Sequence, residues 1–263
     1  MLEEQAAVRH FYETYGWEVG SSGRYRDAEA FVDPRPVLRG YNRRLARRLA
    51  GLLVPAPDGL LDIGCGGDPS PVGGDSATRW VCLDVASAAL RGARQALGTR
   101  AGYVQADVCR LPFPDNTFSR VLCAHVLYHL TPRRQQRAIR EIHRVLTDGG
   151  VAVVIYAQPS TPLYRLARRR RPAAEPDPGG EDDRPPLPYH PIDYHELGRR
   201  LAGHVAIEVR TFAMLEPDVT RAAIPDNVVG RALLAIASAA ETVLARATLP
   251  LARYPMIVIR KRA

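Results

Sequence analysis

The stretch LLDIGCGGD, residues 60–68, decides the fold. An apolar run typical of a buried strand ends at Asp62, and Gly64 and Gly66 then allow a tight turn that lets a ligand approach the main chain. Asp84 ends a second apolar run, and Asp107 ends a third. Because the carboxyl ends of parallel strands meet in one crevice, the three carboxylates are expected to lie together there.

Apolar runs of strand length alternate with segments of helical periodicity along most of the chain. The predicted strands are residues 59–64, 80–86, 103–108, 120–126, 150–156, 205–215 and 254–262. The predicted helices are residues 37–53, 87–97 (with Ser87 as its expected cap), 133–146, 192–203 and 227–247. This alternation predicts an α/β fold: a Rossmann-like, doubly wound, mostly parallel seven-stranded sheet with helices on both faces.

Composition shifts divide the chain into a cap and a main domain. Residues 1–53 are predicted as an N-terminal helical cap that begins with an aromatic-rich stretch. Residues 54–263 form the main domain, interrupted by insertions at 157–191 and 216–253. The first insertion holds nine prolines, which indicates an irregular excursion or lid.

The positive charge does not by itself indicate a nucleic-acid partner. The chain has 263 residues and a formal net charge of +8, and Lys261 is the only lysine among its 36 basic residues. The arginines are spread along the whole chain, which is more typical of codon bias in a GC-rich genome than of a basic surface. A nucleic-acid footprint needs basic residues gathered on one face with aromatic residues among them. Nucleic-acid binding is therefore not expected.

The cysteines and the remaining segments indicate a cytoplasmic protein. Cys65, Cys82, Cys109 and Cys123 show no metal-ligand spacing, so they are expected to be reduced structural thiols without a metal site. The N-terminus lacks the apolar core of a secretory signal. No stretch approaches the roughly 20 uncharged apolar residues of a membrane span.

Two nucleotide-type ligands compete for the glycine loop. A dinucleotide fingerprint needs a third glycine opening a helix, but Pro69 stands in its place. A carboxylate at Asp62 would repel a pyrophosphate, whereas it suits a ligand that carries an ammonium group. S-adenosylmethionine has an ammonium group, a ribose diol that Asp84 can bind, and no phosphate. The alternative is a glycine turn with incidental surface aspartates.

The chain resembles the class I S-adenosylmethionine-dependent methyltransferases, in particular the group that includes ubiquinone/menaquinone-biosynthesis and natural-product methyltransferases. The motifs that carry the resemblance span residues 59–156 and are LLDIGCGG, VCLDVA, VQADVCRLPFPDNTFSRVLCAHVLYHL and REIHRVLTDGGVAVVIY. The resemblance implies that Asp62 and Gly64 lie near the methionyl group, Asp84 on the ribose and Asp107 on the adenine. The cofactor-binding residues that it implies are Asp62, Gly64, Cys65, Gly66, Asp84, Val85, Asp107, Val108, Cys123 and Ala124.

The sequence departs from the family pattern at three places. Asp68 replaces the usual third glycine, and a Pro/Gly-rich stretch at 69–74 replaces the helix that follows the loop. Asp148 stands where the family usually has a proline before Gly149, a change expected to be harmless.

Candidate catalytic and substrate residues follow the fourth predicted strand and fill the N-terminal segment. His125 and His129 are the candidates for a general base, because histidine titrates near neutral pH. A structural role is the alternative, and for His129 it is favoured. Substrate contact is proposed, against plain packing, for Tyr12, Tyr15, Trp17, Tyr25 and Tyr156.

The sequence therefore predicts methyl transfer from S-adenosylmethionine to a small organic acceptor, through oxygen or nitrogen rather than carbon. A non-catalytic S-adenosylmethionine-binding protein is one alternative, suggested by the altered loop at 68–74, and an RNA-directed enzyme is another. The apolar helix at 227–247 is either a core or homodimer helix or one wall of a pocket for a hydrophobic acceptor.

Overall fold

The structure is a computed structural model. It describes residues 2–20, 22–69, 79–158, 161–163, 165–166, 185, 187–192, 196, 199 and 205–262. Its strands are β1 Leu60–Ile63, β2 Trp80–Asp84, β3 Gly102–Gln105, β4 Phe118–Ala124, β5 Leu146–Ile155, β6 Ile207–Ala213 and β7 Tyr254–Arg260. Its α-helices are α1 Leu2–Phe11, α2 Arg26–Phe31, α3 Arg39–Leu53, α4 Ser87–Leu97, α5 Pro132–Val145, α8 Pro217–Ala223 and α9 Val228–Val243.

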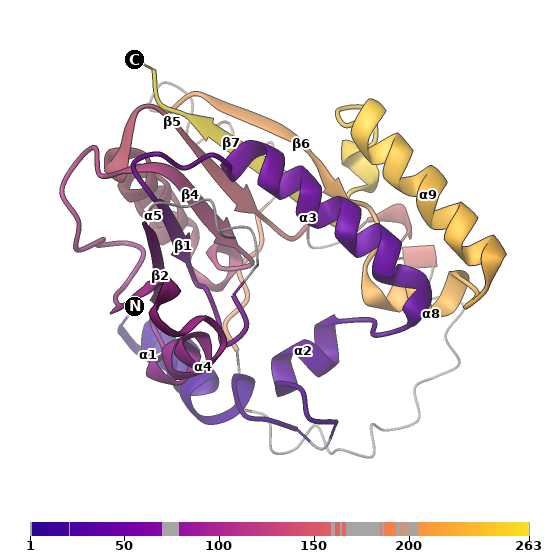
Figure 1. The fold of residues 1–263 in the computed structure, drawn as a ribbon, viewed down its shortest axis with the longest axis horizontal. Coiled ribbons are helices and arrows are strands. Elements are labelled where there is room, and N and C mark those ends of the chain that lie inside the picture. The colour runs from indigo at the N-terminus through magenta and orange to yellow at the C-terminus, as the bar shows by residue number, and fades with distance from the viewer. Residues whose placement is uncertain are drawn as a thin grey trace.

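One sheet organises the described residues, with strand order β3-β2-β1-β4-β5-β7-β6 (Figure 1). The first five strands in this order pair in parallel, whereas β7 runs antiparallel to both β5 and β6. The predicted Rossmann-like architecture with seven strands is confirmed, and the sheet is mixed because of β7. The chain reverses its winding direction between β1 and β4, and open α/β sheets bind ligands beside such a switch point.

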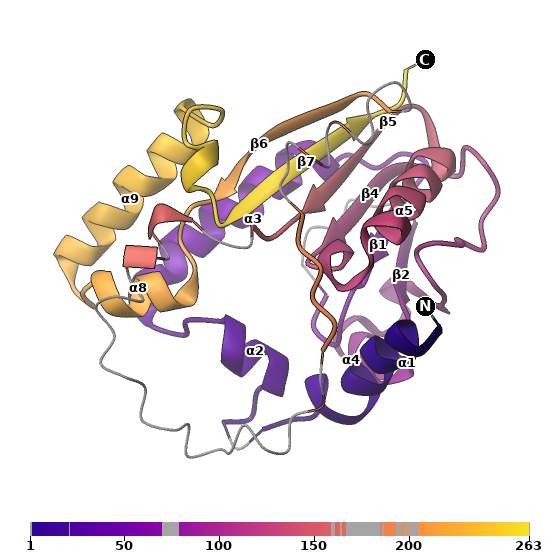
Figure 2. The same ribbon diagram turned by 180° about the vertical axis from the view of Figure 1, so that it is seen from behind.

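Helices cover both faces of the sheet, as the alternation of strands and helices predicts (Figures 1 and 2). Along β1, Leu60 packs in the same buried cluster as α3 and α4, while Leu61 and Ile63 pack with α5. Side chains alternate between the two faces of a strand, so a run that is apolar throughout is buried on both sides. These two layers of core fix the carboxyl ends of β1, β2 and β4.

Most predicted elements agree with the structure, but the cap of α4 does not. Ser87 is the first residue of α4 and its hydroxyl does not cap the helix. Instead, the Glu13 carboxylate accepts hydrogen bonds from the backbone N–H groups of Ser87 (2.6 Å) and Ala88 (3.0 Å). This carboxylate at a helix N-terminus ties the N-terminal segment to the sheet. The helix predicted at 192–203 lies largely outside the described residues.

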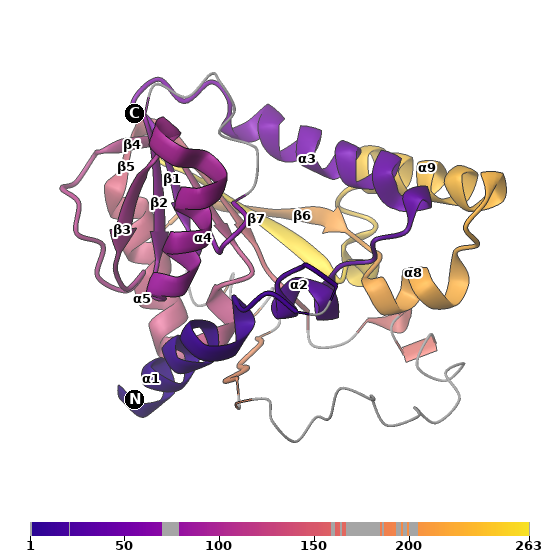
Figure 3. The ribbon, with the colours of Figure 1, turned by 60° about the horizontal axis from the view of Figure 1, so that its bottom comes forward.

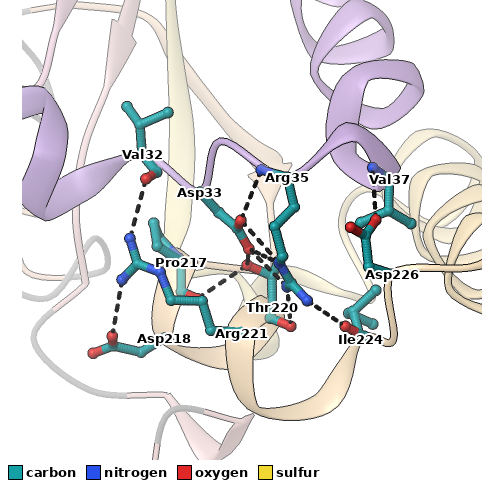
Figure 4. A network of polar contacts seen from close by, with 10 residues as sticks. All are labelled: Val32, Asp33, Arg35, Val37, Pro217, Asp218, Thr220, Arg221, Ile224 and Asp226. Carbon is teal, nitrogen blue, oxygen red and sulfur yellow. Dashed lines mark hydrogen bonds and ion pairs between the residues drawn. The ribbon is translucent and has the colours of Figure 1, made fainter. Parts of the chain in front are cut away.

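A second tie joins the segment before α3 to α8, as Figure 4 shows. The Asp33 carboxylate accepts hydrogen bonds from the Arg35 guanidinium (2.8 Å) and the Thr220 hydroxyl (2.7 Å). Arg35 also donates to the main-chain carbonyls of Thr220 and Ile224, both at 2.7 Å. These hydrogen bonds hold the segment before α3 against α8 and the residue that follows it.

Candidate active site

A cavity of about 240 Å³ lies at the carboxyl ends of β1, β2 and β4, where the winding reverses. Its floor comes from the loops after these strands, and α1, α2 and the segment between them contribute further side chains. The lining residues are Gln5, Val8, Tyr12, Trp17, Asp27, Ile63, Gly64, Cys65, Gly66, Leu83, Asp84, Val85, Ala106, Asp107, Val108, Ala124, His125, Val126, His129, Leu130 and Arg134.

The glycine loop needs its glycines for both conformation and space. Gly64 and Gly66 have φ angles of 66° and 65°, in the left-handed region that favours glycine. A Cβ atom on Gly64 would lie 2.1 Å from a methyl group of Val126, and one on Gly66 would lie 2.4 Å from the Trp17 ring. The loop is therefore closed over by the N-terminal aromatic segment.

Two buried carboxylates lie side by side beneath this loop. Burial and the neighbouring Asp84 raise the pKa of Asp62 to about 7. Burial also raises the pKa of Asp84 to about 6, although its carboxylate accepts hydrogen bonds from the backbone N–H groups of Gly66 (3.1 Å) and Ala86 (2.9 Å). Among the described residues, no basic side chain forms an ion pair with either aspartate. The raised pKa values mean that ionisation of this pair is disfavoured, and a cationic ligand placed beside it would favour the charged form.

Asp107 lies at the far side of the cavity, two residues after β3 ends, and unlike Asp62 and Asp84 it has a basic partner. Its carboxylate accepts hydrogen bonds from the Arg134 guanidinium (2.7 Å), the Gln5 side-chain amide (2.9 Å) and the Cys109 backbone N–H (2.9 Å). Arg134 neutralises this carboxylate, and Gln5 connects it to α1. Asp107 thereby fixes the N-terminal helix over the cavity.

His125 faces the cavity in a strained backbone conformation. Its φ angle is 62°, which a residue with a Cβ atom rarely adopts. The imidazole is exposed to the cavity yet surrounded by protein, and burial in this setting lowers its pKa to about 4, with help from His129 and Arg253. The ring meets those of Tyr254 and Tyr128 edge-on, with centroids 5.1 Å and 6.3 Å away. At neutral pH this histidine is therefore uncharged.

His129 is held by neighbours on both sides of its ring. Its Nδ1 lies 2.8 Å from the carbonyl oxygen of Pro188, and its Nε2 lies 3.4 Å from the Tyr12 hydroxyl. The side chain is buried, and this burial lowers its pKa. These contacts suit the structural role that the sequence favours for His129.

The structure brings most of the predicted site residues together in the lining of the cavity. Five of them lie outside that lining. Asp62 and Cys123 are buried behind it in the sheet. The Tyr25 ring packs on Gly67. The Tyr15 ring lies tilted against the Phe11 ring, and the Arg26 guanidinium lies over it. The remaining residue, Tyr156, is buried and donates a hydrogen bond to the Gln135 side chain (3.0 Å).

Several lining residues were not predicted from the sequence. Gln5, Val8 and Tyr12 follow one another at helical spacing, so the predicted role of Tyr12 could have pointed to the other two. Arg134 and Asp27 carried no comparable signal, because only the folded chain brings their helices to the cavity.

The described part of the chain also bears on other kinds of function. Within it, no cluster of three or more histidine, cysteine or acidic side chains is arranged to hold a metal ion. None of its helices is long and apolar enough to cross a membrane. All four cysteines are buried and free.

The fold and the position of the cavity define a doubly wound α/β protein with a cavity at the switch point, where such sheets bind ligands. Comparison with known proteins sharpens this class. A family model described as a methyltransferase domain matches residues 61–154. A putative methyltransferase of Encephalitozoon cuniculi is 41% identical over 92 residues, which is 35% of this chain and 41% of that protein. The ubiquinone/menaquinone biosynthesis C-methyltransferase UbiE of Hahella chejuensis is 39% identical over 71 residues, 27% of this chain and 28% of that protein.

The fold agrees with these sequence matches. The crystal structure of the N-methyltransferase NodS from Bradyrhizobium japonicum, in complex with S-adenosyl-L-homocysteine, covers 99% of this chain and 98% of its own, with a TM-score of 0.55 and 15% identity. The chain spans less than half the length of the two curated relatives named above. The predicted resemblance to the class I S-adenosylmethionine-dependent methyltransferases is confirmed, and it is densest over residues 61–154.

Proposed function

We propose that this protein binds S-adenosylmethionine in the cavity and transfers its methyl group to an oxygen or nitrogen atom of a small organic acceptor. The observation that carries the proposal is the pair of buried carboxylates, Asp62 and Asp84, which lack a basic partner in the described structure. A cationic ligand with a sugar diol satisfies both of them, whereas a phosphate-bearing dinucleotide would be repelled. The methyltransferase-domain match over 61–154 supports the same ligand.

The residues at the cavity fit the parts of this cofactor. The backbone of Gly64 and Gly66, with Cys65 between them, would hold the methionyl end, where the negative field of Asp62 favours an ammonium group. Asp84 has acceptor capacity left for a ribose hydroxyl beside its backbone hydrogen bonds from Gly66, Ala86 and Val85. Asp107, with Val85 and Val108 beside it, would face the adenine. Ala124 would lie near the sulfur, and Cys123 would support that strand end from the core.

The protein's part in the reaction is alignment and proton removal. The bound cofactor supplies an activated methyl group, and the enclosing side chains of Tyr12 and Trp17 exclude water and align the acceptor. His125 faces the same space in its neutral form, so its imidazole can take the proton of an acceptor O–H or N–H group. We assign His129 to holding Tyr12 in place, through the contact between its Nε2 and the Tyr12 hydroxyl.

The side chains that enclose the cavity indicate the nature of the acceptor. Tyr12 and Trp17 present aromatic surface, which suits a flat or apolar molecule. A proton-accepting histidine is useful for oxygen and nitrogen nucleophiles, and this favours them over carbon. The names of the similar proteins include both a C- and an N-methyltransferase, so they support the class without selecting the atom. We also propose that residues 1–53 act as the cap of this site in a cytoplasmic enzyme.

The cofactor site is tested by replacing Asp84 with Asn and measuring S-adenosylmethionine binding by calorimetry. Hydrogen bonds to a charged group contribute about 1.5–3 kcal/mol, so we expect affinity to fall about 10- to 150-fold. The control is Asp148→Asn, an exposed aspartate away from the cavity, which should bind like the wild type. Equal affinity in both variants would show that Asp84 is not part of the site.

The two alternatives need separate readouts. A non-catalytic binding protein would bind the cofactor yet transfer no methyl group to any member of a phenol, catechol and amine acceptor panel. An RNA-directed enzyme would bind RNA with an affinity that falls steeply with salt. We expect turnover with the panel and no such RNA binding, and the reverse pattern would contradict the proposed acceptor class.

A further inference from the structure

Helix α9 exposes most of its large apolar side chains and buries two polar residues, Ser238 and Glu241. Ile236 and Val243 are 67% and 80% exposed, and Val228, Val229, Leu233 and Leu244 are exposed as well. The buried side instead carries Gly230, Ser238 and Glu241, together with Leu234. An ordinary surface helix has the opposite pattern, so the outer face of α9 is unusual for a face left in water.

The inverted pattern is stable because α3 satisfies the polar inner face. The Glu241 carboxylate is fully buried and accepts hydrogen bonds from the Tyr41 hydroxyl (2.5 Å) and the Met214 backbone N–H (2.8 Å). Arg48 forms an ion pair with it at 3.5 Å and donates to the Ser238 carbonyl oxygen at 3.3 Å. Figure 3 shows α3 and α9 lying side by side. The orientation of α9 is thus fixed, and its apolar face is fixed outward.

The exposed residues form a stripe that is symmetric about Ile236. Val229 and Val243 lie seven residues to either side of it, and Leu233 and Ala239 lie three. Four residues to either side, Ala232 is exposed and Ala240 is half-buried. Two sets of residues repeat at intervals of seven. The first set is β-branched (Val229, Ile236 and Val243), and the second is alanine (Ala232 and Ala239). If two such helices meet antiparallel about Ile236, valine meets valine, alanine meets alanine and leucine fits over alanine.

We propose that α9 is a homodimer interface in which the stripe from Val229 to Val243 packs antiparallel against the same stripe of a second copy. No charge repulsion opposes this contact, because the stripe contains no charged residue and the exposed Arg231 lies outside it. The stripe also lacks the tryptophan and tyrosine residues typical of a membrane-interface helix. It is about 21 Å long, which places the contact at the small end of specific interfaces and makes a concentration-dependent dimer the expected result.

Sedimentation velocity from about 2 to 200 µM tests the proposal. We expect the sedimentation coefficient of the wild type to rise with concentration from that of a monomer to that of a dimer. Ala239→Glu places a charge on the stripe and should stay monomeric over the whole range. Ala223→Glu makes the same change at an exposed position of α8 and should dimerise like the wild type. A wild type that stays monomeric, or an Ala239→Glu variant that dimerises like Ala223→Glu, would overturn the proposal.

Crosslinking tests the antiparallel register. A cysteine at Ile236 would lie on the two-fold axis and meet its own copy, and the four native cysteines are buried. Under mild oxidation we expect Ile236→Cys to form a covalent dimer at least tenfold faster than Ala223→Cys. Equal rates would refute this register.

Anionic vesicles separate the dimer from a competing occupant. The exposed arginines of α3, Arg39, Arg43 and Arg47, could attract an acidic lipid surface instead of a second copy. We expect the wild type not to float with phosphatidylglycerol vesicles. Flotation that Ala239→Glu abolishes and Ala223→Glu retains would assign the face to a membrane and overturn the dimer. S-adenosylmethionine binding should be equal in all these variants, because α9 contributes no residue to the cavity.

Discussion

At the scale of single residues, the most informative position is His125, where the backbone carries strain at the site. Its left-handed φ angle of 62° costs about 1–2 kcal/mol for a residue other than glycine. The hydrogen bond from its N–H to the Ile155 carbonyl oxygen (3.0 Å) holds the turn. The strained turn aims the imidazole into the cavity directly after β4 ends. The motif CAHV predicted a histidine at the site but not this conformation, which depends on contact with β5.

The environment of His125 predicts its titration. Because burial lowers its pKa to about 4, the imidazole should remain neutral down to about pH 5. Its Cε1–H proton resonance, assigned with His125→Gln, should therefore titrate with a midpoint near 4 in an NMR series. A folded pKa below the unfolded value also means that this residue reduces stability as pH falls from 6.5 toward 4. A midpoint between 6 and 7 would contradict the lowered pKa of His125.

At the scale of elements, the periodicity of the sequence predicted the bounds of individual helices but not the contacts between elements. Helix α4 has the predicted bounds, Ser87–Leu97, since apolar spacing and a glycine at its end mark it within the sequence. Its cap was not predictable, because Glu13 lies 74 residues away from Ser87. The same holds for Asp107, whose partners Gln5 and Arg134 come from two distant helices. Ties between elements depend on the fold and leave no periodic signal in the sequence.

The tie between Asp33 and α8 is the strongest case and gives a stability prediction (Figure 4). Burial opposes ionisation, but hydrogen bonds from Arg35 and Thr220 outweigh it and lower the pKa of Asp33 to about 2. A depressed pKa stabilises the fold above the unfolded value of 3.8, and this contribution is lost as pH falls toward 2. We expect Asp33→Asn to lower the free energy of unfolding by about 2 kcal/mol at pH 7 in urea titrations.

The control for this experiment is Asp218→Asn on the same helix. Asp218 forms a partly exposed ion pair with Arg221 at 3.6 Å, and such pairs contribute about 0–1 kcal/mol. The difference between the two variants should shrink as the pH is lowered from 5 to 3. An Asp33→Asn variant as stable as Asp218→Asn at pH 7 would show that the tie does not hold the N-terminal segment.

At the scale of the whole molecule, the cavity and the apolar face of α9 lie in different regions. The cavity is closed by α1 and the segment after it, whereas α9 packs against α3 and β6 (Figures 1 and 2). The sequence located the floor of the site through three strand ends, because strand order and glycine turns are local signals. It placed aromatic residues of the N-terminal segment near the site but could not show which of them reach it. Only the tertiary ties of Glu13 and Asp107 decide that.

This separation predicts where ligand binding will change the molecule. Amide hydrogen exchange with and without saturating S-adenosylmethionine should show slower exchange in residues 5–17 and in the loops after β1, β2 and β3. Binding couples these segments because Gln5, Tyr12 and Trp17 line the cavity together with the strand ends. Helix α9 should exchange at the same rate in both samples when the protein is dilute. Protection of α9 equal to that of α1 would mean that the ligand acts on the whole fold. Protection confined to the strand ends would mean that the N-terminal segment is packing and not part of the site.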